Sequence, residues 1–196
     1  MVRTVEALPA GPFTAEDAAE LGVSESTLYR MARAGKLEKV APGLFLRPGG
    51  DAVDTVLLDA ATRASRATIC LSSALAHYDL VDEIPAATDL ALPRGAHRPD
   101  QGRAALRWHW FDADTFELGR DTIIIDGTRT EIGIYTAARS IVDVFRLRGV
   151  AGYEIGIEAL RSWLRRRGSH PAELIDLAAR LPRAETPLRT ALDHLA

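Results

Sequence analysis

Basic side chains cluster in one short N-terminal stretch of a chain whose formal net charge is −3. Residues 30–47 contain a single acid, Glu38, and five bases. The five bases are Arg30, Arg33, Lys36, Lys39 and Arg47. Lysine and arginine neutralise phosphates, and affinity for nucleic acid depends on such local clusters more than on total charge. The cluster therefore predicts contact with a phosphate backbone.

Two short predicted helices position this cluster. Thr14 can cap the first helix, and Asp17 follows at capping-box spacing, with Asp in place of the usual Glu or Gln. Gly22 ends that helix, because glycine readily takes the left-handed conformation of a helix stop. Ser24 can cap a second helix that reads to about Ala34. Two helices joined by a tight glycine turn are typical of a helix-turn-helix, whose second helix enters the major groove.

The second predicted helix has two unlike faces. Leu28, Met31 and Ala32 share helical spacing and should face the core. The opposite face and its flanks carry the polar and basic residues that we expect to contact DNA. These residues are Ser24, Ser26, Thr27, Tyr29, Arg30, Arg33 and Lys36.

A predicted hairpin follows this helix. Residues 36–47, KLEKVAPGLFLR, alternate apolar and polar positions around a Pro-Gly turn. This pattern predicts a two-stranded wing with Lys39, Pro42, Gly43 and Arg47 as further DNA contacts. A helix pair with a glycine turn also occurs in proteins that never touch DNA, but the wing and the basic cluster favour a winged helix-turn-helix. With so few cations, useful affinity implies a dimer or help from the basic C-terminal segment.

A second basic cluster lies near the C-terminal end of a predicted helix. Its members are Arg161, Arg165, Arg166 and Arg167. Cations at that end interact favourably with the helix dipole, which alone would explain them. They could equally form an auxiliary surface for DNA phosphates or an acidic partner. Both interpretations stay open.

The remaining polar residues do not predict catalysis. The five histidines lack the short spacing of a metal site, and a single cysteine cannot build a zinc cluster. Ser72 and Ser73 lack the glycines of a nucleophile elbow. Asp112 and Asp114 are best interpreted as a turn at a strand end, and His109 as a structural or surface residue. We therefore expect no enzymatic activity, no metal and no cofactor.

Composition indicates a folded protein of the cytoplasm. The chain has 196 residues, and 47% of them are hydrophobic, which is ordinary for a globular protein. The sequence has no apolar run of membrane-spanning length and no secretory signal. Cys70 lies in an apolar run and reads as a small buried residue, in keeping with a reducing compartment.

Pro48-Gly49-Gly50 predicts a boundary between two domains, residues 1–50 and 51–196. The second domain is expected to be α+β, with a small, mainly antiparallel sheet and several helices. Asp51 should cap a helix that runs to about Ser65. Strand patterns occupy TDLALPRG, AALRWHWF and the two arms of a hairpin around Asp126-Gly127, and helical patterns follow from Thr136.

The order of these segments resembles the AbiEi family, the antitoxins of type IV abortive-infection toxin–antitoxin systems. The family's N-terminal winged helix is similar to the stretch FTAEDAAELGVSESTLYRMARAGKLEKVAPGLFLRPG. Its longer C-terminal region is similar to three further stretches, LSSALAHYDLVDEIPAATDLALPRG, YTAARSIVDVFRLRG and IEALRSWLRRRG. The resemblance covers nearly the whole chain.

This resemblance implies a bacterial antitoxin encoded beside a nucleotidyltransferase-like toxin. The winged helix would bind inverted repeats in its own promoter, as a possible homo-oligomer, and repress the operon. The C-terminal region would counteract the toxin, directly or indirectly. Two alternatives remain: a small-molecule-responsive winged-helix repressor, and a protein-interaction module that does not bind DNA. A nuclease is the weakest alternative, because the chain lacks a clustered carboxylate–lysine site.

Overall fold

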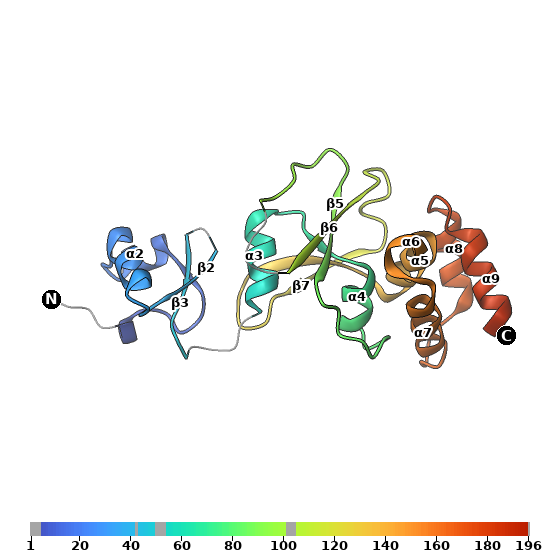
Figure 1. Cartoon of the computed structure of the whole chain (residues 1–196), viewed down its shortest axis with the longest axis horizontal. Helices are drawn as coiled ribbons and strands as arrows, with labels where there is room; N and C mark the ends of the chain where they lie inside the picture. The colour runs from blue at the N-terminus through green and yellow to red at the C-terminus, as the bar shows by residue number, and fades with distance from the viewer. Residues whose placement is uncertain (1–4, 42, 50–53, 101–104, 196) are drawn as a thin grey trace. The chain divides into compact units, whose positions relative to one another are not determined.

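The chain folds into two compact units, seen here in a computed structural model that describes residues 5–41, 43–49, 54–100 and 105–195. Unit 1 comprises residues 1–65 and 124–131, and unit 2 comprises residues 66–123 and 132–196. Figure 1 shows the chain coloured from its N- to its C-terminus. No helix among the described residues is long and apolar enough to cross a membrane.

Unit 1 combines short helices with a small antiparallel sheet. Its α-helices are α1 (Ala15–Glu20), α2 (Glu25–Arg33) and α3 (Thr55–Arg63), preceded by the 3-10 turn η1 (Val5–Ala7). Its strands are β1 (Phe13–Thr14), β2 (Glu38–Ala41) and β3 (Leu44–Leu46), in the order β1-β3-β2.

The predicted start of α1 is confirmed. The Oγ1 atom of Thr14 accepts a hydrogen bond from the Asp17 backbone N–H at 3.2 Å. The Thr14 backbone N–H in turn donates to Oδ2 of Asp17 at 2.7 Å. Together these bonds form the capping box, which satisfies two donors that a helix start leaves free.

The turn between α1 and α2 depends on a glycine in the left-handed region. Gly22 has a φ of +71°, which costs glycine little but strains residues that carry a Cβ atom. The next residue, Val23, donates its backbone N–H to the Ala18 carbonyl oxygen at 2.8 Å. Its side chain is 5% exposed, so it closes the turn against the core.

The predicted hairpin is present as β2 and β3, which pair antiparallel with Lys39 opposite Phe45. Strand β1 adds to the other side of β3 and places Phe13 opposite Phe45. The Phe13 and Phe45 rings stack at 6.2 Å and join Leu28 of α2 in the core of the unit. Figure 1 shows α2 beside β2 and β3.

Helix α3 begins later than the sequence suggested. Its N-cap is Asp54, whose Oδ1 atom accepts the backbone N–H groups of Val56 and Leu57 at 3.0 and 2.9 Å. The cap predicted at Asp51 lies outside the described residues. The helix ends at Arg63, which pairs with Asp59 one turn earlier at 2.8 Å.

Unit 2 contains a five-stranded sheet in the order β6-β5-β4-β8-β7. The strands are β4 (Thr68–Ile69), β5 (Thr88–Pro93), β6 (Leu106–Phe111), β7 (Arg120–Ile124) and β8 (Glu131–Tyr135). Strands β5 and β6 match the predicted segments. Strands β7 and β8 are neighbours joined through Asp126-Gly127, so the predicted hairpin is confirmed.

This sheet is mixed, whereas the sequence led us to expect mainly antiparallel pairing. β4 pairs antiparallel with β5, but β4 and β8 are parallel, and so are β5 and β6. Alternating apolar and polar residues predict where strands lie, but they do not predict which strands pair or in which direction. Strand β5 ends at Pro93 and β6 begins at Leu106, a separation in sequence long enough for the crossover that parallel neighbours need.

The C-terminal helices of unit 2 gather around a buried helix, α5, as Figure 1 shows. They are α5 (Ala137–Arg146), α6 (Arg148–Ala151), α7 (Tyr153–Leu164), α8 (Pro171–Ala179) and α9 (Glu185–Leu195). Another helix, α4 (Leu71–His77), packs on α5 and on β5. Eight consecutive residues of α5, from Ala138 to Phe145, are buried, so this helix is the centre of the hydrophobic core.

Candidate nucleic-acid interface

Helix α2 presents its two predicted faces as the sequence indicated. Leu28 is 0% exposed and belongs to the core of unit 1, with Met31 and Ala32 packed half-buried against it. Arg30 and Arg33 are exposed. The apolar side therefore fixes the helix to its unit, while the two guanidinium groups remain on the surface of that unit.

Hydroxyl groups surround the first turn of α2. The Ser24 Oγ atom lies 3.1 Å from Ser26 Oγ and 3.0 Å from Thr27 Oγ1. Arg30 Nη2 approaches Thr27 Oγ1 at 3.4 Å, which directs this arginine toward the N-terminal end of the helix. Hydroxyl donors and a guanidinium group at a helix N-terminus are suited to phosphate and base-edge contacts.

Tyr29 joins the helix to the hairpin. Its half-buried ring meets Phe45 of β3 edge-on at 5.4 Å, and the Lys39 Nζ atom of β2 lies 5.0 Å from its centroid. A cation over a tyrosine ring is weakly attracted to it. The sequence placed Tyr29 on the outward face, and the structure gives it this second contact with the core. Lys39 is thereby drawn toward the α2 side of the hairpin.

The other predicted residues of this region have different surroundings. Lys36 is exposed just after α2, and Gly43 lies half-buried in the hairpin. Pro42 lies outside the described residues. Arg47 is engaged within the unit: its Nη1 atom donates to the carbonyl oxygens of Leu8 at 2.9 Å and Glu6 at 3.3 Å. These bonds hold the N-terminal segment beside the end of β3.

Helix α1 carries the opposite charge. Glu16, Asp17 and Glu20 are all exposed on it. Hydrogen bonds from the Thr14 backbone and side chain lower the pKa of Asp17, so this carboxylate is negative at neutral pH. An acidic α1 repels phosphates and an α2 with exposed arginines attracts them. Unit 1 therefore offers a nucleic acid one favourable helix face.

The arginines near the end of α7 do not share one environment. Arg161 and Arg165 line a hollow of about 550 Å³ together with the acids Asp82 and Glu158. The Nη2 atom of Arg166 donates to the backbone carbonyls of Tyr78 and Asp79, the latter at 2.8 Å. Arg167 is exposed. Arg166 thus stabilises the turn after α4, whereas the other three guanidinium groups lie at the surface of unit 2.

Other residues considered for chemistry have structural surroundings. The His109 Nε2 atom lies 2.8 Å from Oδ1 of Asp89, which is buried in the sheet. Burial raises the pKa of the Cys70 thiol well above its ordinary value, so the thiol stays protonated. Asp112 Oδ1 accepts the Asp114 N–H at 3.0 Å and forms the predicted turn after β6. Within the described ranges, no three His, Cys, Asp or Glu side chains gather as a metal site.

A buried charged cluster in α5 carries no sequence motif. Arg139 and Asp143 are fully buried, and Arg146, also bound to Asp143, is nearly so. Asp143 follows Arg139 by four residues and precedes Arg146 by three, and such spacings bring opposite charges together on a helix. This spacing is the signal in the sequence that predicts their contact. Burial of the whole helix depends on packing partners distant in sequence, which that spacing does not reveal.

Comparison with known proteins supports a regulatory role for the N-terminal segment. Residues 2–48 match the family model described as "Transcriptional regulator, AbiEi antitoxin". No curated protein matches the chain. A crystal structure of the RV2827C protein from Mycobacterium tuberculosis superposes with a TM-score of 0.65 at 17% identity, covering 96% of this chain and 73% of that one. At this identity the likeness shows a shared fold.

The family match includes α1, α2, β2 and β3, and with them the exposed arginines of α2. It agrees with the resemblance noted for the same residues. The N-terminal segment of this chain, residues 2–48, is therefore similar to the AbiEi antitoxin transcriptional regulators.

Proposed function

We propose that this chain is a bacterial type IV antitoxin that represses its own operon. Residues 1–50 form a winged helix-turn-helix that binds inverted repeats in the promoter, and residues 51–196 counteract a nucleotidyltransferase-like toxin in the cytoplasm. The observation that carries the proposal is the exposure of Arg30 and Arg33 on a helix whose Leu28 is fully buried. These arginines lie within the segment matched by the regulator family.

In this proposal α2 is the recognition helix and the β2–β3 hairpin is the wing. The first turn of α2 contributes the Ser24, Ser26 and Thr27 hydroxyls, and Arg30 reaches base edges in the major groove. Arginine binds guanine through two donors at once, which makes it the commonest specific contact in that groove. Arg33 and Lys39 contact phosphates, which position the protein without reading sequence.

The described residues on and near α2 offer few cations to phosphates, so a single copy should bind DNA weakly. Arg47 is hydrogen-bonded to the N-terminal segment, and α1 is acidic. Affinity for DNA rises with the number of phosphates neutralised. We therefore propose that two copies occupy the two halves of an inverted repeat, whose half-sites lie about one helical turn apart.

Gel retardation with the DNA upstream of this gene tests the proposal. At low salt the purified chain should retard that fragment in preference to an unrelated duplex. Arg30→Ala should weaken the specific complex by about 1–3 kcal/mol if the side chain reads a base. Arg180→Ala, which removes an exposed arginine from unit 2, is the matched control and should bind like the wild type.

Two outcomes would contradict the proposal. One is a wild-type protein that fails to retard its upstream DNA, and the other is an Arg30→Ala variant with unchanged affinity. The antitoxin part has a separate test, in which co-expression with the product of the neighbouring gene should restore growth. Restored growth without DNA retention would favour a protein-interaction module over a repressor.

A further inference from the structure

Helix α5 buries more positive than negative charge. Arg139 donates a hydrogen bond from Nε to Oδ2 of Asp143 at 2.8 Å. Arg146 donates from its Nε atom to Oδ1 of the same carboxylate. One carboxylate therefore pairs with two guanidinium groups. The Nη2 atoms of both arginines are buried and have no hydrogen-bond partner among the described residues. Buried charges are ordinarily paired and an unpaired donor is costly, so the Nη2 atom of Arg146 is a donor that an anionic ligand can use.

Arg146 brings this excess charge to the wall of two hollows in unit 2. Its side chain is 10% exposed and stacks on Phe111, with 5.0 Å from the guanidinium carbon to the ring centroid. It lines a pocket of about 600 Å³ with Arg148 and Arg183, and a second of about 400 Å³ with Arg94 and Arg183. Both volumes suit a small ligand.

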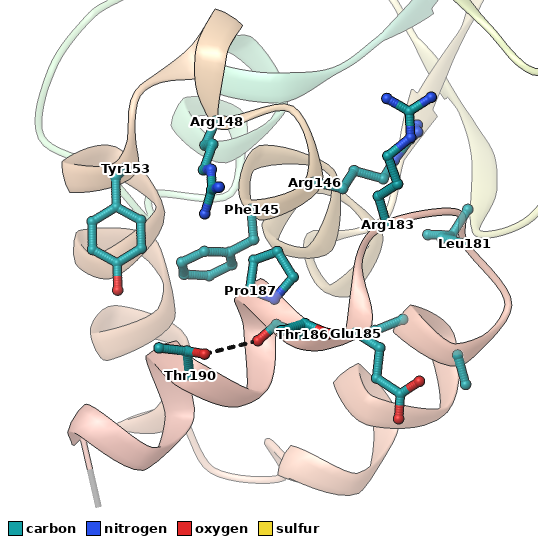
Figure 2. Close-up of a pocket in the computed structure, with 12 residues that line it drawn as sticks. Phe145, Arg146, Arg148, Tyr153, Leu181, Arg183, Glu185, Thr186, Pro187 and Thr190 are labelled. Carbon is teal, nitrogen blue, oxygen red and sulfur yellow. Dashed lines mark hydrogen bonds between the residues drawn. The ribbon is translucent and has the colours of Figure 1, made fainter.

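Figure 2 shows how the first pocket is built. Arg148 extends from α6 into the space between Tyr153 and Phe145, whereas the side chains of Arg146 and Arg183 lie together on the other side of Phe145 and point away from Arg148. The one acid of this pocket, Glu185, points away from the three arginines and pairs with Arg189 at 2.9 Å. The positive charge around the pocket is therefore not neutralised from within.

The backbone at Arg183 agrees with a role for its side chain. Arg183 has a φ of +61°, in the left-handed region that glycine occupies without strain. Glycine would fit this turn between α8 and α9 more easily, yet an arginine stands there with its side chain lining both hollows. Strain of this kind is often retained at ligand sites.

From this arrangement we infer that unit 2 binds a small phosphorylated molecule, with its phosphate held by Arg146 and Arg183, which line both hollows. A phosphate accepts several hydrogen bonds at once and matches the fork of the guanidinium group. The recessed position of Arg146 favours a small ligand over a duplex, whose backbone meets exposed side chains. Tyr153, partly exposed beside Arg148, gives a planar group of the ligand a surface to stack on.

Thermal unfolding of the full chain tests this inference, and it does not depend on DNA binding or on the toxin. Inorganic phosphate and adenosine 5′-monophosphate are compared with potassium chloride at equal ionic strength. Both phosphates should raise the melting temperature above the chloride value, since a ligand of the native state stabilises it. A larger shift with the nucleotide indicates an organic phosphate, and equal shifts indicate the free ion.

Variants assign the effect to this pocket. Arg183→Gly should unfold at or above the wild-type temperature without ligand, because it relieves backbone strain, yet bind phosphate about ten- to a hundredfold more weakly. Arg94→Ala, which removes the further arginine of the second hollow, should also reduce the shift. Arg180→Ala, an exposed arginine at the end of α8 outside both hollows, should keep it. A wild-type protein without a phosphate-specific shift, or variants that shift as much as the control, would overturn the inference.

Discussion

Among single residues, Thr14 and Asp17 give the clearest link between sequence and local structure. Their two reciprocal hydrogen bonds start α1, which in turn leads through Gly22 into α2. Both side chains are exposed, so the hydrogen bonds and not hydrophobic burial account for their effect. The spacing alone predicted this contact, because a capping box joins residues only three positions apart.

Thr14→Ala should lower the free energy of unfolding by about 1 kcal/mol, since the Asp17 backbone N–H loses its acceptor. Urea unfolding monitored by circular dichroism measures this change. Thr14→Ser keeps the hydroxyl group and should recover most of the loss. An alanine variant as stable as the serine variant would show that the cap contributes nothing.

The lowered pKa of Asp17 makes part of the stability depend on pH. The folded state holds this carboxyl below its ordinary pKa of 3.8, so its contribution is complete above that value and disappears as the pH falls through the folded pKa. Urea midpoints measured between about pH 5 and about pH 3 should therefore fall less steeply for Asp17→Asn than for the wild type. Parallel curves for the two proteins would contradict this assignment.

Sequence reasoning at this scale succeeded for local contacts and failed for distant ones. The exposure of Arg30 and the burial of Leu28 follow from helix periodicity alone. The hydrogen bonds of Arg47 and Arg166 could not be predicted, because their acceptors are backbone carbonyls 39 and 87 residues away. The types of side chains in a sequence do not predict where a distant backbone oxygen lies in the folded protein.

At the scale of helices and strands, the sheet of unit 2 depends on a close approach at Gly133. The Arg120 side chain of β7 reaches across β8, and its Nε atom donates a hydrogen bond to Thr68 Oγ1 on β4 at 2.8 Å. A Cβ atom on Gly133 would lie 2.5 Å from Arg120 Nη2 and 2.6 Å from Thr68 Oγ1. Only a residue without a side chain leaves room for this hydrogen bond between strands β7 and β4.

Gly133→Ala should therefore destabilise the protein by about 1–3 kcal/mol, the usual range for overpacking. Differential scanning calorimetry of the full chain measures the loss. Gly149→Ala is the matched control, because a Cβ atom at Gly149 meets nothing within 4 Å. Equal melting temperatures for the two variants would mean that the neighbours of Gly133 move aside at no cost.

Strand positions were readable from sequence, but strand partners were not. β5 and β6 appeared where alternation and aromatic residues predicted them, and the Asp-Gly turn correctly predicted the β7–β8 hairpin. The parallel pairs β4–β8 and β5–β6 join segments separated by long connections. Helix α4 packs on β5 and on α5, so the core that these strands share involves contacts between segments far apart in the sequence.

For the molecule as a whole, the two units carry different kinds of chemistry. Unit 1 has exposed arginines on a short helix, which suits a long, repeating polyanion. Unit 2 has one recessed arginine, Arg146, which belongs to a buried charged cluster and lines two hollows, and this arrangement suits a compact anion. The net charge of −3 reveals neither, because both features are local.

The salt dependence of duplex binding tests the central claim, that the arginine-bearing face of α2 contacts DNA. Fluorescence anisotropy of the labelled upstream duplex gives the affinity across a series of salt concentrations for the wild type, Arg33→Ala and Arg180→Ala. If Arg33 neutralises a phosphate, its replacement should reduce the slope of log affinity against log salt by about one, while Arg180→Ala keeps the wild-type slope. A wild-type affinity that does not change with salt concentration would contradict the account. An Arg33→Ala slope equal to that of the wild type would contradict it as well.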